Sequence, residues 1–554
     1  MADILELLKT SKKRLFVGLA GPGTGKTYTF RKIIESNEYK NKQILILSFI
    51  NKLINDLQED FENCKNVTVS TLHAFARQQI GDVDFDEDLD KIISEDFFYI
   101  TGKAVDYEKK FFEDKLEPDE FSFYKGRKNF YKNQKSLYSF NSIVYALNRH
   151  FEKNPGKIPG NYDLVLIDEF QDFNKSEYEL IKLLNRKSRV VVVGDDDQSL
   201  YCGLKDAVPN QIRSLYRDKN AEQFSIDYCF RCTSVIVNAV NDLITNAKNS
   251  GFLRDRINEK KFLYPTGVKP EKDLVSNNFD KIDFIPAVCG DKLMYELSKA
   301  IKNDVKEERS RREKNNDKEN SIRILIITPS YFKKTIYEGL LKNGLNVVEF
   351  ELFSDEKTNK MKHKKIINLF RTLSTRKTDN LSLRNLLPLY LEDDDIKDLI
   401  VKSHKLADKK IWLCLDPKIQ KQIEKDISIF KKVKKNSKKL EEKELIRFSK
   451  VFNTKNVLSK LIHGFDSVSK NAIEVEITTL MSSKGLSADF VYYVGVDDKE
   501  ILDKKTNKFT NQKICEFLVG LTRAKEKLTL ISMQDKNPKI LDFLDKSYIK
   551  TINV

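Results

Sequence analysis

One glycine-rich run in this chain of 554 residues has the residue types and the spacing of a phosphate-binding loop. It consists of Gly21, Pro22, Gly23, Thr24, Gly25, Lys26 and Thr27. Glycines let backbone N–H groups wrap around phosphate oxygens, the lysine reaches the β- and γ-phosphates, and the threonine hydroxyl serves a Mg²⁺ ion. An apolar run precedes the loop and a helical pattern follows it, as this motif requires. We therefore predict that residues 21–27 bind ATP and Mg²⁺.

Two carboxylates stand at the end of the apolar run 164–167. Open α/β sheets bind their ligands at the carboxyl ends of strands. We therefore expect Asp168 to hold Mg²⁺, directly or through water, and Glu169 to orient or deprotonate the attacking water. Adjacent acids at a strand end can also cap a helix, but the phosphate-binding loop favours the catalytic interpretation.

A second polar run, Gly-Asp-Asp-Asp-Gln-Ser over residues 194–199, follows the apolar segment 190–193. The neutral Gln198 can contact the γ-phosphate and transmit the loss of this phosphate to the nucleic acid site. Three consecutive acids are also typical of a solvated turn, so this run alone does not decide between the two interpretations.

Short, unbroken apolar runs must position these residues. In the first half of the chain they lie at 15–19, 44–47, 67–69, 164–167 and 190–193. Such runs are typical of parallel strands buried on both faces, and helical patterns alternate with them. The pattern predicts a doubly wound α/β domain. A second α/β set begins near residue 225, with strand-like runs at 322–327, 473–480, 490–496 and 528–532.

Two helical stretches interrupt this pattern and read as insertions. The first is rich in Phe, Tyr and Lys, and the second is strongly basic. The predicted organisation is a first α/β domain at 1–76 and 161–225 with an insertion at 77–160, and a second at 226–370 and 471–554 with an insertion at 371–470.

Composition adds weaker constraints. The 98 basic and 83 acidic residues give a formal net charge of +15, which suits a polyanionic partner but also a lysine-rich proteome. No apolar run approaches the roughly 20 residues that cross a bilayer, and the N-terminus lacks the features of a signal peptide. We expect a cytoplasmic location and no membrane partner. Cys229 and Cys232 have C-x-x-C spacing, but packing is favoured over a metal site because no second pair stands close by.

Eight motifs in order resemble those of superfamily 1A helicases of the UvrD/Rep/PcrA type. They lie at 21–27, 48–52, 70–75, 168–172, 194–201, 227–231, 478–486 and 517–525. The resemblance implies two RecA-like P-loop motor domains, 1A and 2A, which cleave ATP between them. The two predicted insertions match the family's 1B and 2B subdomains in position.

The resemblance also implies roles for single residues. Arg231 and Arg523 would reach the γ-phosphate from the second motor domain, as arginine fingers do. Phe230 would lie near the adenine, and Gly485 would belong to the nucleotide site. Four further residues would contact single-stranded DNA, with the aromatic ones stacking on bases: Phe49, Asn51, His73 and Tyr201.

The activity implied by the resemblance is that of an ATP-dependent DNA helicase or translocase that moves 3′→5′ on single-stranded DNA. Its partners would be single-stranded and tailed double-stranded DNA. Some family features are absent: Cys202-Gly203-Leu204-Lys205 replaces the usual aromatic and arginine, so one base-stacking platform is missing. Within the motif at 478–486, Met481 stands where the family usually has His. Directly after the motif, Ser487 stands where the family usually has Glu.

A narrower resemblance is to compact UvrD-like proteins such as the helicase subunit of the Gabija anti-phage system. It implies a nuclease subunit of the OLD type as a partner and a place in an anti-phage defence complex or a DNA repair complex, and the sequence leaves both pathways open. The alternative function is a DNA-stimulated ATPase that senses DNA ends and activates a partner nuclease with little unwinding.

Overall fold

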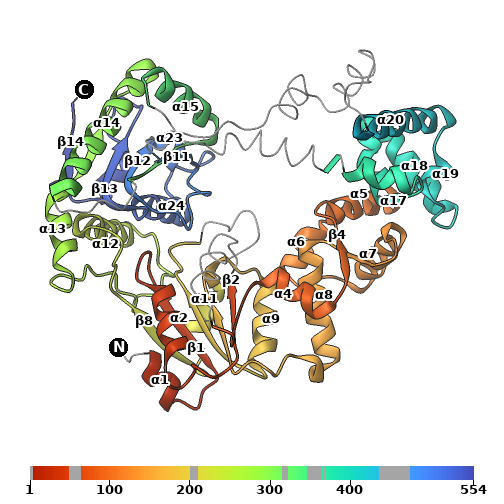
Figure 1. Cartoon of the computed structure of the whole chain (residues 1–554), viewed down its shortest axis with the longest axis horizontal. Coiled ribbons are helices and arrows are strands. Elements are labelled where there is room, and N and C mark those ends of the chain that lie inside the picture. Colours follow the sequence, from red (N-terminus) through yellow and green to blue (C-terminus); the bar gives the residue numbers. More distant parts are fainter. Residues whose placement is uncertain are drawn as a thin grey trace. The chain divides into compact units, whose positions relative to one another are not determined.

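The computed structural model describes residues 4–48, 61, 64–199, 210–314, 322–345, 365–366, 368–435 and 474–553. The chain divides into two compact units. The first unit, from 1–72, 151–350 and 468–554, holds two parallel sheets (Figure 1). The second unit, from 73–150 and 351–467, is mainly helical. Among the described helices, none has the length and apolar character needed to cross a membrane.

The first sheet has six parallel strands. Their order is β3 (Val67–Thr71), β2 (Ile44–Ser48), β6 (Leu164–Ile167), β7 (Arg189–Gly194), β1 (Leu15–Ala20) and β8 (Ala221–Ile226). The central strands are buried along their length, as their unbroken runs of Val, Ile and Leu require for a sheet covered on both faces. We call this sheet and its flanking helices, from residues 4–72 and 151–226, the first lobe.

The second sheet also has six parallel strands. Their order is β11 (Glu474–Thr478), β10 (Arg323–Ile327), β12 (Ala488–Val494), β13 (Ala524–Ile531), β9 (Ile282–Ile285) and β14 (Ile549–Thr551). We call this sheet and its helices, from residues 227–345 and 474–553, the second lobe. Two parallel sheets confirm the predicted α/β fold.

Helices connect the strands of both lobes. The first lobe contains α1 (Ile4–Thr10), α2 (Lys26–Glu35), α9 (Lys175–Asn185) and α11 (Asn210–Tyr216); the second contains α12 (Ser234–Asn249), α13 (Pro270–Asn278), α14 (Gly290–Lys314), α15 (Lys333–Lys342), α23 (Asp498–Ile501) and α24 (Asn511–Leu521). A capping box fixes the start of α9: the Asn174 side chain accepts from the Glu177 backbone N–H at 2.9 Å, and Glu177 accepts from that of Asn174 at 2.8 Å. This cap ends the loop that follows Asp168 and Glu169.

Helices from both predicted insertions build the second unit. They are α4 (Leu72–Ile80), α5 (Leu89–Thr101), α6 (Tyr107–Phe112), α7 (Pro118–Tyr131), α8 (Phe140–Lys153), α17 (Asn380–Leu386), α18 (Asp393–Lys405), α19 (Ile411–Cys414) and α20 (Pro417–Lys435), with the short parallel pair β4 (Val83–Phe85) and β5 (Ser136–Tyr138). One apolar core joins the two insertions: Leu89 and Ile93 belong to the same buried cluster as Leu383 and Ile400. Figure 1 shows α5 beside α17 and α18.

An ionic network lies at the junction of the two insertions. Asp96 is fully buried and accepts hydrogen bonds from Arg127, Tyr131 and Arg384. The Arg127 guanidinium makes a two-nitrogen contact, with Nε 2.9 Å and Nη2 2.5 Å from Asp96 Oδ2. Both guanidinium groups are also nearly inaccessible to solvent, so the one carboxylate ties the insertions together in a low-dielectric setting.

Replacing Arg127 with methionine should lower the stability of this unit by about 3 kcal/mol, the low end of the cost of breaking a buried ion pair, because Arg384 still faces Asp96. Lys135, which pairs with Asp82 on the exposed surface, provides the control, and Lys135→Met should leave stability nearly unchanged. Chemical denaturation measures both variants. Equal midpoints for the two would contradict this assignment.

Candidate nucleotide site

The glycine-rich loop connects the end of β1 to the start of α2. Gly23 and Gly25 have φ angles of 70° and 89°, which side chains with a Cβ rarely adopt. Gly25 is the N-cap of α2 and supplies no side chain to cap it. The first-turn N–H groups of α2 therefore offer hydrogen bonds and a positive dipole end to an anion. The local backbone fits a phosphate group.

Lys26 lies between the two carboxylates at the end of β6. Its Nζ is 2.6 Å from Glu169 Oε1 and 3.8 Å from Asp168 Oδ1. Burial raises the pKa of Asp168 to about 6, against the opposing effect of Lys26. Burial also acts to raise the pKa of Glu169, but Lys26 and Lys484 outweigh it and bring that pKa to about 2. Glu169 is thus an ionised carboxylate beside the phosphate-binding loop, paired with Lys26.

The backbone at Glu169 is strained. Its φ of 50° lies in the left-handed region, which costs a non-glycine residue free energy and is found at functional sites. Gln171 fixes the side chain, since its Nε2 donates to Glu169 Oε2 at 2.5 Å and its Oε1 accepts from the Asp195 backbone N–H at 2.9 Å. The loop after β6 is therefore joined to the loop after β7.

Arg231 of the second lobe packs on the same loop, and Arg523 lies close enough for the charge of Arg231 to act on it. A Cβ added to Gly23 would lie 2.3 Å from Arg231 Cβ, so the Arg231 stem packs directly on the glycine. The Arg523 side chain is 2% exposed and donates to the end of the preceding helix, α24, with Nε 2.9 Å from the Val519 carbonyl oxygen. Burial and the neighbouring charge of Arg231 lower the pKa of Arg523 to about 9.

This arrangement fits an anion between the lobes. Within the described part of the chain, Arg523 forms no ion pair with a carboxylate, although it is buried. Buried charges are normally paired, so two neighbouring guanidinium groups beside a phosphate-binding loop indicate a site for a phosphate chain. Together with Lys26, Asp168 and Glu169, the residues fit ATP with a divalent cation.

The remaining predicted nucleotide residues lie as follows. The Phe230 backbone N–H donates to the Gly23 carbonyl at 2.9 Å, while its ring is 41% exposed and Lys269 Nζ lies 5.6 Å from the ring centre. Gln198 is buried and its amide donates to Asp195 Oδ2 at 2.7 Å. Gly485 has a φ of 82°, in the turn after β11. Thr27 lies in the first turn of α2.

Lys484 is a residue of this site to which the sequence analysis assigned no role. It comes from the second lobe, and its Nζ lies 2.6 Å from Asp172 Oδ1 and 2.6 Å from the Gln198 carbonyl oxygen in the first. Burial raises the pKa of Asp172 to about 6, against the opposing effect of Lys484. The sequence signal that could have identified Lys484 is its place directly before Gly485, within the helicase-like motif at 478–486.

The C-x-x-C pair lies at the same interface. Cys229 Sγ donates to the Pro22 carbonyl at 3.3 Å, and Cys232 Sγ donates to the Thr522 carbonyl at 3.7 Å. Both side chains are fully buried. These contacts support the packing interpretation. The sulfur of Cys229 packs against the phosphate-binding loop, and the sulfur of Cys232 packs against Thr522, which precedes Arg523.

The predicted DNA contacts are only partly described. Phe49, Asn51 and Tyr201 lie outside the described residues. His73, in the second unit, contacts the ring of Phe140 edge-on at 5.7 Å between ring centres. Phe140 in turn stacks on Phe85 at 5.7 Å, with an interplanar angle of 28°.

His73, Phe140 and Phe85 form an aromatic column. Arg77 lies over the ring of Phe85 at 5.3 Å, and Phe140 is 51% exposed. Sequence reasoning missed Phe85 and Phe140 because they lie outside every recognised motif. The exposed ring of Phe140 is of the kind on which nucleic acid bases stack.

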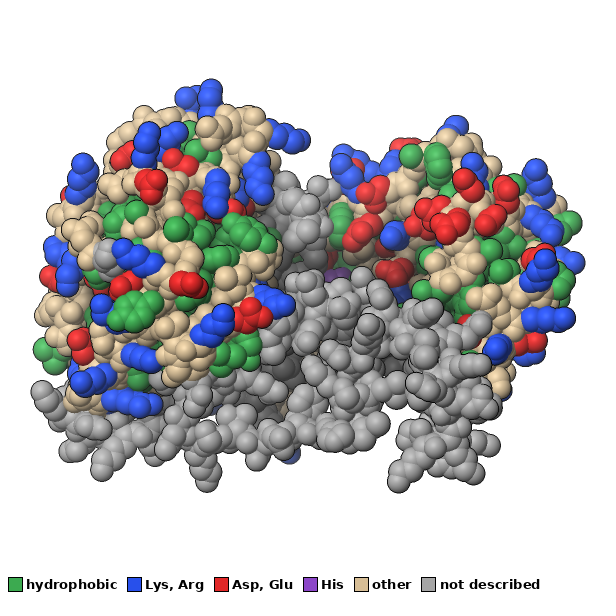
Figure 2. All heavy atoms as spheres, turned by 90° about the horizontal axis from the view of Figure 1, so that it is seen from above, with side chains coloured by type: hydrophobic (Ala, Val, Ile, Leu, Met, Phe, Trp, Pro, Cys, Tyr) green, Lys and Arg blue, Asp and Glu red, His purple; other side chains and the backbone are tan. Residues whose placement is uncertain are grey.

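Net charge does not locate a DNA surface. Figure 2 shows one face of the molecule, on which Lys and Arg side chains are interspersed with Asp and Glu. The coloured residues of this face form no single basic band. Among the residues coloured on this face, charge alone therefore marks no DNA surface.

Comparison with known proteins agrees with this geometry. Residues 6–204 match a family model described as an AAA domain, and residues 396–535 match the UvrD-like helicase C-terminal domain. "ATP-dependent DNA helicase Rep" from Buchnera aphidicola subsp. Schizaphis graminum is 23% identical over 92% of this chain and 90% of the relative.

Other relatives align over shorter stretches. "DNA helicase II" of Haemophilus influenzae is 25% identical over 51% of this chain, which spans 46% of that relative. "DNA helicase II" of Escherichia coli is 40% identical over 94 residues, or 17% of this chain and 13% of its own length. The chain thus matches about half the length of the Haemophilus influenzae relative and 13% of the length of the Escherichia coli relative.

Proposed function

Since this chain belongs to the UvrD-like helicases, we propose that it hydrolyses ATP with Mg²⁺ between its two lobes and uses this reaction to move 3′→5′ along single-stranded DNA. The observation that carries the proposal is the packing of Arg231, from the second lobe, on Gly23 of the phosphate-binding loop of the first, with Arg523 buried close enough for the charges of Arg231 and Glu169 to act on it. A nucleotide bound there would contact both lobes, so its hydrolysis would change how tightly they hold together.

Each residue then has a role in hydrolysis. Asp168 and Thr27 would hold the Mg²⁺ ion, which neutralises phosphate charge. Lys26 would exchange its contact with Glu169 for the β- and γ-phosphates. Glu169, released from Lys26, would accept a proton from the attacking water, and the two arginines would stabilise charge on the phosphoryl group.

Strand displacement tests this function. The substrates are two duplexes of identical sequence, one with a 3′ single-stranded tail and one with a 5′ tail. With ATP and Mg²⁺, the 3′-tailed duplex should be separated much faster. Equal rates, or faster separation of the 5′-tailed duplex, would contradict the proposed polarity.

The same assay distinguishes the alternative function. Strong DNA-stimulated turnover with no strand displacement on either substrate would support a DNA-sensing ATPase that acts on a partner. The quoted relatives are all named as helicases, so a nuclease partner, and with it a role in defence or repair, stays a prediction from sequence.

We further propose that the aromatic column of Phe85 and Phe140 stacks with a base of the bound strand. Replacing Phe140 with alanine should weaken single-stranded DNA binding roughly tenfold, since stacking on an aromatic side chain is worth about 1–3 kcal/mol per base. Fluorescence anisotropy with a labelled oligonucleotide measures the affinity. Phe121→Ala provides the control, because Phe121 is a 41% exposed aromatic of the same unit outside the column. Equal affinity for both variants would remove Phe140 from the DNA path.

A further inference from the structure

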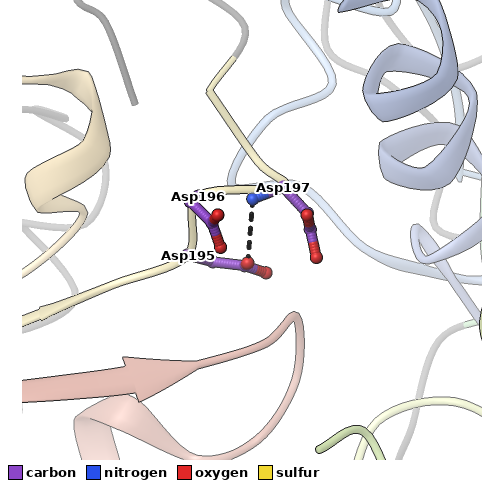
Figure 3. A group of neighbouring side chains, drawn as sticks. All are labelled: Asp195, Asp196 and Asp197. Carbon is purple, nitrogen blue, oxygen red and sulfur yellow. Dashed lines mark hydrogen bonds between the residues drawn. The ribbon is translucent and has the colours of Figure 1, made fainter. Parts of the chain in front are cut away.

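Three consecutive aspartates after β7 are buried side by side (Figure 3). Asp195, Asp196 and Asp197 are 1%, 1% and 2% exposed, and one carboxylate oxygen of each lies within 4.8 Å of the others. The Asp197 backbone N–H also donates to Asp195 Oδ1 at 3.1 Å. Three carboxylates at this separation repel one another strongly in a buried site, so their ionised forms require cations.

The ammonium group of Lys260 fills the space between them. Its Nζ is 2.9 Å from Asp196 Oδ1 and also contacts carboxylate oxygens of Asp195 and Asp197. The side chain is 3% exposed, and the three aspartates together hold its pKa well above the usual range despite burial. Because a protein cation already occupies the centre of the cluster, the three carboxylates form an ion-pair site rather than a metal site.

Two arginines complete the charge balance. Arg256 Nε lies 2.8 Å from Asp197 Oδ2, and Arg213 Nε lies 3.0 Å from Asp196 Oδ2. With Lys260, three cations face three carboxylates. Breaking one of these pairs would leave a buried charge without a partner, which is costly.

Lys260 and Arg256 belong to the second lobe, whereas the aspartates belong to the first. The segment that carries the two cations is fixed at both ends, because Leu253 and Phe262 are part of the apolar core of the second lobe. The Leu253 backbone N–H also donates to Asn511 Oδ1, at the start of α24, at 2.9 Å. The cluster therefore joins the lobes at a point separate from Arg231 and Arg523.

A chain of hydrogen bonds connects this junction to the catalytic carboxylate. Lys260 contacts Asp195, whose backbone N–H donates to Gln171 Oε1 at 2.9 Å. Gln171 donates in turn to Glu169 Oε2 at 2.5 Å, and Gln198 donates to Asp195 Oδ2 at 2.7 Å. A displacement of Asp195 would therefore move the groups that orient Glu169 and Gln198.

We propose that Lys260 is a positioning residue for ATP hydrolysis, which holds Asp195 and thereby sets Gln171 and Gln198 relative to Glu169 when the two lobes are docked. Lys260 does not itself touch the nucleotide. Its effect falls on turnover rather than on ATP binding, because the contacts of the phosphate-binding loop do not pass through it. This inference rests on the proposed ATP hydrolysis at Glu169.

The test compares Lys260→Gln, Lys260→Arg and the control Lys261→Gln, which neutralises the adjacent exposed lysine. DNA-stimulated kcat should fall roughly 10²-fold in Lys260→Gln, the cost of a misplaced catalytic group. The ATP dissociation constant should change less than threefold. Lys260→Arg keeps the charge and should recover most of the loss, while Lys261→Gln should turn over like the original chain.

A double variant distinguishes an effect on catalysis from a loss of folding. Lys260→Gln combined with Asp195→Asn removes one cation and one carboxylate together. If Lys260 acts through Asp195, the double variant should lose no more kcat than the worse single variant. Fully additive losses, an unchanged kcat in Lys260→Gln, or a loss of kcat and Tm that arginine does not recover would each overturn the proposal. If the unaltered chain hydrolyses no ATP, the proposed function fails first, so the two failures are distinguishable.

Discussion

Replacing Lys26 with alanine should abolish ATP turnover, both with and without DNA. Lys26 is the only cation of the loop 21–27, and it lies within reach of the phosphates that the loop would cradle. Its loss would leave negative charge on the transferring phosphoryl group without its nearest protein cation. Steady-state phosphate release should fall to the rate without enzyme.

Lys32→Ala provides the matched control, because Lys32 is an exposed lysine of the same helix, α2. It should hydrolyse ATP at the original rate. Thermal denaturation of both variants checks that the chain is folded, since removing Lys26 also leaves the buried Asp168 and the half-buried Glu169 without the cation that lies between them. DNA-stimulated hydrolysis by folded Lys26→Ala at the original rate would refute the site assignment.

The second large effect is expected at Arg523. Arg523→Ala should reduce kcat roughly 10³-fold, the lower end for loss of an arginine finger, and leave ATP binding nearly unchanged. The guanidinium is buried beside Arg231, and burial lowers its pKa. We propose that an arginine kept at this cost would stabilise the negative charge that develops on the phosphoryl group during the reaction. Single-turnover hydrolysis and equilibrium binding of a nucleotide separate the two effects.

Lys525→Ala provides the control for this variant, since Lys525 is two residues away, 38% exposed and 3.5 Å from Asp489. It should retain both binding and turnover. If Arg523→Ala instead lost ATP binding and kept its residual kcat, Arg523 would be a ground-state contact and its assigned role would be wrong.

Much of the fold could be predicted because the local signals agree. The apolar runs 164–167 and 190–193 are strands in the structure, and the helix after the phosphate-binding loop begins at Lys26. Three strands of the large sheets were missed, β8, β9 and β14, as was the short pair β4 and β5. The sequence of β9, Ile-Asp-Phe-Ile, is short, and its Asp283 pairs with Lys527 of a neighbouring strand that only the fold brings close.

The sequence also singles out Lys26, Asp168 and Glu169, which the structure brings together, because each motif carries its own residue types at a fixed spacing. The catalytic roles of these residues stay a prediction. What could not be predicted are contacts between distant segments. Nothing near Lys260 in sequence indicates three buried aspartates, and nothing near Asp96 indicates that Arg127 and Arg384 share it. Such contacts depend on tertiary packing and become visible only in three dimensions.

The most direct test of the account is steady-state ATP hydrolysis by the purified chain with Mg²⁺, measured while single-stranded DNA is added. A cleft that couples the phosphate site to a DNA strand predicts a low rate without DNA and a saturable increase as DNA is added. The increase should be absent in Lys26→Ala. Hydrolysis that ignores DNA, or no hydrolysis at any DNA concentration, would contradict the claim that this chain is a DNA-driven ATPase.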